Sequence, residues 1–266
     1  MFIKIALFIF ITISLYAQEK SWYQKINPSI ELGMHVSVFG GSIDNIHSNT
    51  DIHDDLKYND SSSSYLALGL RTDYAYMPNF KINYFLETQN TSIDHNNTIY
   101  IADGIFDSNT TIASNINYSV MNFTIFHDFK QKGRNLKFLR WHFYPGDIEY
   151  YLGINLKVIK WRIDLENSLL KTKHWIDVEK NIPLPYAGFQ YFYKDFRGFA
   201  SISALSFSKA KSLNFEYGIS YQVYQDLYIN ASYLYENFQV TESAGEHIDT
   251  IKFKTFGNKF SVKYIF

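Results

Sequence analysis

The first long polar stretch of the chain groups side chains that could do chemistry. Two histidines and four aspartates gather there: His47, Asp51, His53, Asp54, Asp55 and Asp60. Imidazole nitrogens and carboxylate oxygens bind divalent metals, and a carboxylate with an imidazole can act as an acid and base pair. Their spacing matches no defined metal-binding loop, and charge clusters between structured segments are usually solvated. We therefore expect a solvated acidic loop, with no metal and no cofactor.

Two further histidines could serve in lipid hydrolysis, where a histidine activates a serine nucleophile. His127 is followed by Asp128, and His142 follows Trp141. No serine lies at a recognisable spacing from either histidine, and such catalysis needs a geometry that spacing alone does not supply. The sequence therefore assigns no catalytic residue, and we expect the protein not to be an enzyme.

Charge and cysteine content exclude several classes of protein. The chain has 25 Lys and Arg against 26 Asp and Glu, a formal net charge of −1. It therefore lacks the basic excess that gives nucleic-acid binding its affinity, and no nucleic acid is expected as a partner. It has no cysteine, which excludes disulfides, thiol catalysis and a lipid-anchored N-terminus.

The N-terminus has the layout of an export signal. Lys4 precedes an apolar run from Ile5 to Leu15, and the small residue Ala17 follows. This pattern predicts a signal peptide over 1–17, because the run is shorter than the roughly 20 residues that a spanning helix needs. No internal repeat or long linker divides 18–266, which we interpret as one domain.

Apolar and polar residues alternate in three long segments, 147–158, 212–224 and 256–266. Successive side chains of a strand point to opposite faces, so one face would meet lipid and the other water. Runs of about 10 to 13 residues suit a tilted transmembrane strand, whereas strands of soluble sandwiches are usually about 5 to 6 residues long. The alternation therefore predicts a membrane β-barrel.

The same pattern, extended along the chain, predicts ten strands. They are 29–40, 63–76, 80–92, 112–127, 147–159, 183–193, 198–208, 212–224, 226–239 and 250–266. Tight connections would lie in the periplasm and longer ones, such as 160–182, outside the cell. Turns near Tyr144-Pro145-Gly146-Asp147 and Lys160-Trp161 would instead give twelve strands, but we favour ten, with 128–146 as a periplasmic connection. The expected fold is all-β, a transmembrane antiparallel up-and-down barrel.

The polar face of these strands should line the lumen. The candidate lumen residues are Glu87, Glu149, Asn155, Lys157, Glu216 and Glu236. A ten-stranded barrel is only slightly wider than eight-stranded ones, which side chains fill, so we expect paired charges and a polar, plugged lumen. Aromatic residues near strand ends, among them Phe85, Trp161 and Trp175, are expected to form belts at the two membrane interfaces.

The last residues carry a resemblance. Phe260, Val262, Tyr264 and Phe266 alternate up to a final aromatic. This ending resembles the C-terminal signature of bacterial outer-membrane barrels. The resemblance implies that these four residues are an assembly signal, read by the barrel-assembly machinery.

The wider arrangement resembles an uncharacterised family of proteobacterial outer-membrane β-barrel proteins. The shared features are the long acidic first loop, the turn in 74–80, the Gly-x-Asn-Leu-Lys strand at 153–157 and the Pro-x-Pro-Tyr-Ala segment at 183–187. The chain departs from the family by its longer 128–146 connection. None of these motifs carries chemistry.

The resemblance and the strand pattern together lead to one functional expectation. We expect an integral protein of the outer membrane of a Gram-negative cell envelope, with a structural or surface-interaction role, surrounded by outer-membrane lipids and lipopolysaccharide. A narrow, porin-like channel for small solutes is the alternative, and a rim enzyme acting on lipid A or peptides is the second. The sequence leaves the oligomeric state open.

Overall fold

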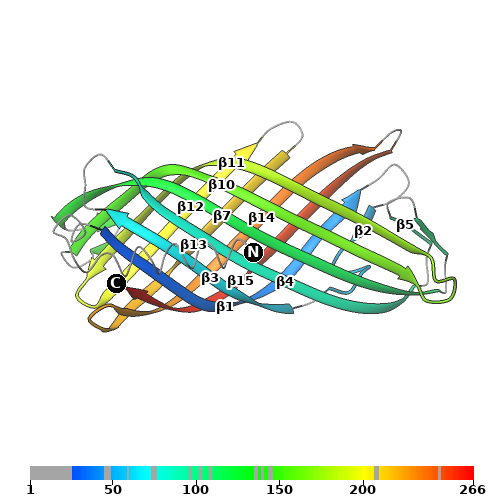
Figure 1. The fold of residues 1–266 in the computed structure, drawn as a ribbon, viewed down its shortest axis with the longest axis horizontal. Coiled ribbons are helices and arrows are strands. Elements are labelled where there is room, and N and C mark those ends of the chain that lie inside the picture. Colours follow the sequence, from blue (N-terminus) through cyan, green and yellow to red (C-terminus); the bar gives the residue numbers. More distant parts are fainter. Residues whose placement is uncertain are drawn as a thin grey trace.

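The fold is all-β in the residues that the structure, a computed structural model, describes. These are 26–44, 49–58, 60–72, 77–95, 98–101, 104–107, 110–134, 137–138, 141–142, 146–206, 210–244 and 247–266. Within these ranges ten long strands form one antiparallel ring (Figure 1). No helix there is long and apolar enough to cross a membrane. The predicted signal peptide 1–17 lies outside the described residues.

The ring consists of strands that pair in chain order. Its members are β1 (Ile26–Asp44), β3 (Asp60–Thr72), β4 (Asn79–His95), β7 (Thr110–Arg134), β10 (Gly146–Asn167), β11 (Lys173–Tyr193), β12 (Phe196–Ser206), β13 (Ala210–Tyr224), β14 (Leu227–Ala244) and β15 (His247–Ile265). The last strand, β15, pairs with β1 from Ser29 opposite Ile265 to Asp44 opposite Thr250, which closes the ring. The predicted ten-stranded barrel is confirmed.

Five further short strands are not members of the ring. β2 (Asn49–Asp51) extends the sheet beside β1, and β5 (Ile99–Ile101) pairs with β6 (Gly104–Phe106). The predicted connection 128–146 is shorter than expected, because β7 continues to Arg134; beyond it, β8 (Lys137–Phe138) and β9 (Trp141–His142) form a separate two-stranded sheet. Because they do not join the ring, the described residues give ten strands in it rather than twelve.

The two ends of the barrel differ. At one end, here called the terminal end, β1 begins, β15 ends and tight turns at 194–195 and 225–226 join neighbouring strands. The opposite end, here called the distal end, carries β2 and the β5–β6 hairpin. The C-terminus marks the terminal end at the left of Figure 1, and β2 and β5 lie at the right.

The outward face of the barrel changes polarity along each strand. On β10, Leu152, Ile154 and Leu156 are exposed and apolar, whereas Lys160 and Arg162, nearer the distal end, are exposed and charged. Since exposed apolar surface is disfavoured in water, the first stretch suits lipid and the second suits water. The apolar stretch of the outer face is here called the apolar belt.

Neighbouring strands change polarity at matching heights. Val158 of β10 pairs with Met121 of β7, and the next outward pair is Lys160 with Ser119. On the other side of the ring, Tyr235 pairs with Phe256, and the next outward pair is Asn237 with Lys254. The apolar belt therefore ends along a shared boundary, as expected of a surface that meets a bilayer.

The inward face has the opposite order. Toward the terminal end it carries buried polar groups such as Asn155 and Lys157, whereas toward the distal end it carries fully buried Ile159, Trp161 and Ile163. The hydrophobic core of the molecule therefore lies inside the distal half of the ring, above the apolar belt.

Several strands are longer than the sequence predicted. The segment 160–182 was expected to be a loop, but β10 continues to Asn167 and β11 starts at Lys173. The prediction failed because it treated outward charged residues such as Arg162 and Asp164 as the end of a strand. Strand alternation in fact continues there, with the polar residues outside and the apolar residues inside.

Candidate functional site

The buried polar groups of the lumen are the candidate functional site. The structure places all six candidate lumen residues on the inner face, each no more than 9% exposed: Glu87, Glu149, Asn155, Lys157, Glu216 and Glu236. Their side chains point inward because each has the inward parity of its strand. Buried charges require partners, and the partners come from strands across the lumen.

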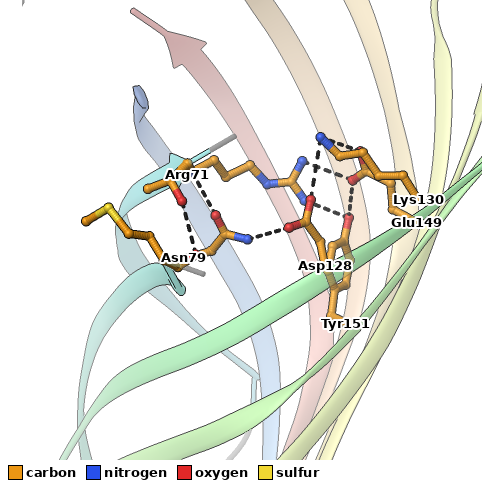
Figure 2. A network of polar contacts seen from close by, with 8 residues as sticks. Arg71, Asn79, Asp128, Lys130, Glu149 and Tyr151 are labelled. Atoms are coloured by element: carbon orange, nitrogen blue, oxygen red, sulfur yellow. Dashed lines mark hydrogen bonds and ion pairs between the residues drawn. The ribbon is translucent and has the colours of Figure 1, made fainter. Parts of the chain in front are cut away.

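A first network lies near the terminal end and joins β3 to β10 (Figure 2). Arg71 is 3.1 Å from the Glu149 carboxylate and donates a hydrogen bond of 2.7 Å to the Tyr151 hydroxyl. Tyr151 in turn donates to Glu149 at 2.9 Å. The three groups form a closed triangle in which the guanidinium and the hydroxyl share one carboxylate, the arrangement that stabilises a buried charge.

Figure 2 also shows how the network reaches β4 and β7. Asn79 donates to Asp128 at 2.8 Å and accepts a hydrogen bond of 2.8 Å from the backbone N–H of Thr72. Lys130 lies 3.6 Å from Asp128 and 3.8 Å from Glu149. The carboxylates near this end of the lumen are therefore paired with cations, and the network connects four neighbouring strands.

A second network lies deeper and is centred on Lys259. Its ammonium group is 2.5 Å from Glu216 and 3.5 Å from Glu31, and it sits 4.2 Å from the centre of the Tyr65 ring. Ser232 donates a hydrogen bond of 3.0 Å to Glu216. One cation thus pairs with two carboxylates from different strands. Of this set, the sequence singled out only Glu216.

A third network lies at the boundary with the apolar interior. Lys157 is 3.4 Å from Glu236 and donates a hydrogen bond of 2.7 Å to Asn214. The Tyr118 hydroxyl donates a hydrogen bond of 3.0 Å to Glu236, so the carboxylate is also bound by an aromatic residue of the core. Asn155, nearby in sequence, donates to Asn122 at 3.0 Å. Every charged group of this network therefore has a partner from another strand.

Glu87 belongs to a separate buried cluster beneath the core. It accepts a hydrogen bond of 2.6 Å from Ser37 and lies 3.4 Å from His35, and both His35 and Glu87 are fully buried. Serine, histidine and glutamate meet here, but the serine donates to the carboxylate rather than to the histidine. The Ser37 hydroxyl is therefore held by the acid, and neither ring nitrogen of His35 has a hydrogen-bond partner among the described residues.

A layer of aromatic rings fills the lumen above these networks. This aromatic layer consists of Phe39, Phe85, Tyr118, Trp161, Phe238 and Phe253, all at most 2% exposed. The Phe253 ring centre lies 4.5 Å from that of Tyr118, 5.3 Å from that of Phe39 and 6.0 Å from that of Trp161. These are contact distances for packed rings, so side chains occupy the centre of the lumen at this level.

Two residues of this layer had been expected elsewhere. Phe85 and Trp161 were predicted to lie in the interfacial aromatic belts, but both are buried inside the barrel. Their strand parity places them inward, and the prediction considered only their position along the strand. Trp175, from the same predicted set, is 60% exposed.

Residues 49–58 of the acidic first loop pack against β4 and β7: Thr91 donates a hydrogen bond to the Leu56 carbonyl, and the Tyr58 hydroxyl is hydrogen-bonded to Ser114. Asp51 accepts hydrogen bonds from the backbone N–H groups of His53 (2.8 Å) and Asp54 (2.7 Å), which shapes a tight turn. Behind the turn, Leu56 and Tyr58 are fully buried, and burial raises the pKa of Tyr58 to about 12. No group of three potential metal ligands occurs in the described ranges. His47 lies outside them, and Asp60 is exposed.

The remaining candidates lie on the outside of the barrel. His127 is exposed on the outer face of β7, opposite Leu152 of β10, and the side chain of His142 lies outside the described residues. The four residues of the predicted assembly signal point outward and are 42–54% exposed: Phe260, Val262, Tyr264 and Phe266. They extend the apolar belt to the terminal end.

Deleting Phe266 is expected to lower the amount of protein in the outer membrane several-fold while changing the stability of the assembled barrel little. The side chain is half exposed, so its loss removes little buried surface, together with a contact with the Tyr264 ring and one backbone hydrogen bond to Pro28, whereas an assembly signal would lose its last aromatic. Quantifying the membrane fraction and its urea midpoint measures the two effects separately. Tyr224→Ala, another exposed aromatic at the terminal end, is the control. Normal membrane levels of the shortened chain would contradict the prediction.

Comparison with known proteins gives likeness of fold only. No family model and no curated protein matches the chain. The translocator domain of the autotransporter NalP from Neisseria meningitidis is 10% identical, with a TM-score of 0.44 over 99% of this chain and 95% of that one. Neisserial surface protein A is 11% identical, with a TM-score of 0.34 over 91% and 97% of the two chains.

A third similar structure is Ail, the attachment invasion locus protein of Yersinia pestis, at 8% identity and a TM-score of 0.31 over 88% of this chain and 99% of that one. All three are outer-membrane β-barrel proteins of Gram-negative bacteria. At these sequence identities and TM-scores, the similarity shows neither the family nor the function of this chain. The resemblance to an uncharacterised proteobacterial family therefore stays a prediction.

Proposed function

We propose that this chain is an integral outer-membrane protein with a structural or surface-interaction role, and that its lumen is closed to solutes. The observation that carries the proposal is the reversal of polarity along the strands. Outward side chains are apolar where inward ones are polar, and polar where inward ones are apolar. A β-barrel that crosses a bilayer and then continues into water as an ordinary packed barrel requires this order.

The proposed orientation places the terminal end in the periplasm. The tight turns at 194–195 and 225–226 support it, since periplasmic turns of such barrels are short. The distal half then projects from the cell, and outer-membrane lipids and lipopolysaccharide surround the apolar belt. Export through the signal peptide 1–17 is part of the same proposal.

The outer face of the distal half supports a surface-interaction role. A shallow cavity of about 480 Å³ lies there, lined by side chains of β4, β7, β10 and β11. Trp175, Asn115 and Arg162 are among its residues, and Trp175 is 60% exposed. An exposed ring beside amide and guanidinium groups can stack on a polar partner and hydrogen-bond it.

The aromatic layer supports a closed lumen, which leads to a test by conductance. The refolded protein is expected to give no steady current in a planar bilayer, because packed rings leave no continuous water path. Truncating two of them, in Trp161→Ala/Phe253→Ala, is expected to give small discrete steps, since both rings are fully buried at the centre.

The control for this experiment is Phe189→Ala/Phe215→Ala, which removes two exposed rings from the outer face and should stay silent. Heat-modifiable migration on a gel establishes that each variant is folded. Steady, charge-selective steps from the unmodified protein would overturn the closed lumen and favour the narrow channel. Glu149 and Lys157 would then be the residues to exchange.

A further inference from the structure

A small cavity lies in the lumen between the Lys259 network and the terminal end. Its volume is about 70 Å³, and its charged lining consists of Glu31, Lys81, Glu216, Arg197, Lys259 and Lys263. Four of these side chains are cations and two are carboxylates. The lining therefore holds two more basic than acidic side chains inside a barrel, where water screens charge poorly.

The two carboxylates are already engaged. Lys259 lies 2.5 Å from Glu216 and 3.5 Å from Glu31, and serine hydroxyls donate to both acids. Among the described residues, Lys81, Arg197 and Lys263 have no carboxylate within 4 Å. The acids toward the terminal end are also engaged, since Glu149 is held by Arg71 and Lys130. Within the part of the chain that the structure describes, the neighbouring network therefore supplies no close ion pair to these three cations.

Arg197 is held between two aromatic rings, and one of its donors has no partner. Its guanidinium lies 4.6 Å from the centre of the Phe192 ring and 4.8 Å from that of Tyr228, so two aromatic faces fix its plane. Its Nε is buried without a hydrogen-bond partner. A buried, unsatisfied donor on a charged group is costly, and a bound acceptor would offset that cost.

We propose that this cavity binds a small inorganic anion, such as chloride or phosphate, through Arg197, Lys81 and Lys263. The size of the cavity sets the class of ligand: about 70 Å³ accommodates a few water-sized groups, because each needs roughly 10–15 Å³ of such volume. A sugar or a lipid headgroup does not fit. The anion would join β4, β12 and β15 and offset positive charge in the lining of the cavity.

The test is thermal unfolding of the refolded protein with different sodium salts at one ionic strength. Chloride, bromide or phosphate is expected to raise the unfolding temperature by about 3 °C or more relative to gluconate, which is too large for the cavity. Crystals grown in bromide are expected to show anomalous scattering at Arg197 and Lys263. Equal unfolding temperatures in all salts, or no bromide in the cavity, would overturn the proposal.

Matched double variants identify the site. Arg197→Gln/Lys263→Gln is expected to abolish the difference between salts, whereas Lys211→Gln/Lys254→Gln, which removes two exposed charges from the outer face, should keep it. A difference that persists unchanged in the first variant would overturn the assignment. If that variant does not refold, the comparison of salts and the bromide experiment on the unmodified protein still decide. Neither measurement depends on whether the lumen conducts.

Discussion

Replacing Gly257 with alanine is expected to prevent most of the refolded protein from closing into a barrel. Gly257 lies on β15, opposite Ser37 of β1, in the pairing that closes the ring. A Cβ atom there would lie 1.9 Å from the carbonyl oxygen of Val36 and 2.6 Å from the Cα of Ser37. Both are backbone atoms, so relief requires the two strands to separate. Overpacking costs about 1–3 kcal/mol and occasionally more. Here the cost falls on β1 and β15, the pair of strands that closes the ring.

The measurement is the fraction of protein that migrates as the compact form on an unheated gel. Gly40→Ala is the matched control, because Gly40 lies on β1 in the same strand pair and a Cβ there meets no atom within 4 Å. The control should refold like the unmodified chain. Equal compact fractions for the two variants would contradict the prediction, because the β1–β15 pairing would then tolerate the extra methyl group.

Replacing Lys259 with methionine is expected to lower the free energy of unfolding by about 3–5 kcal/mol, the usual cost of leaving a buried charge unpaired. The substitution leaves Glu31 and Glu216 without their shared cation in a site where all three residues are at most 9% exposed. The urea midpoint, together with the slope of the transition, measures the loss.

Neutralising the acids distinguishes charge from packing. Glu31→Gln/Glu216→Gln in the Lys259→Met background is expected to recover part of the lost stability, because the two acids that Lys259 paired no longer carry charge. Lys254→Met, at an exposed outward position of the same strand, should change the free energy by no more than about 0.5 kcal/mol. If the triple variant is as unstable as the single one, the shape of the lysine rather than its charge holds the network.

Strand alternation predicted the fold because it needs only local information. Each ring strand was found, since a lipid-facing residue such as Leu152 and a lumen residue such as Asn155 differ in polarity wherever the barrel crosses the membrane. Strand ends were predicted less well. Above the membrane the same alternation continues with its meaning reversed, so Arg162 looks like a loop residue and Trp161 looks like an interfacial one.

The candidate site was predictable in part for a related reason. Inward parity placed Glu216 and Lys157 in the lumen, but it could not identify the side chains with which they form ion pairs. Lys259 meets Glu31 and Glu216 because the tilt and stagger of the ring bring three strands to one height, and these are global properties of a closed barrel. Arg71 and Tyr151 were missed although both have the inward parity of the lumen residues.

The shared boundary between the apolar belt and the charged outer face also fixes the depth of the barrel in the membrane. If the barrel moved deeper into the membrane, the charged side chains of Lys160 and Arg162 would enter hydrocarbon. If it moved outward, Ile154 and Leu156 would be exposed to water. Movement along the membrane normal is therefore opposed in both directions. From Lys160 to the tip of β10 at Asn167 the strand runs on the order of 20 Å. In the proposed orientation, the distal mouth would therefore stand at a fixed distance from the lipid, and a partner that binds there would bind at that distance.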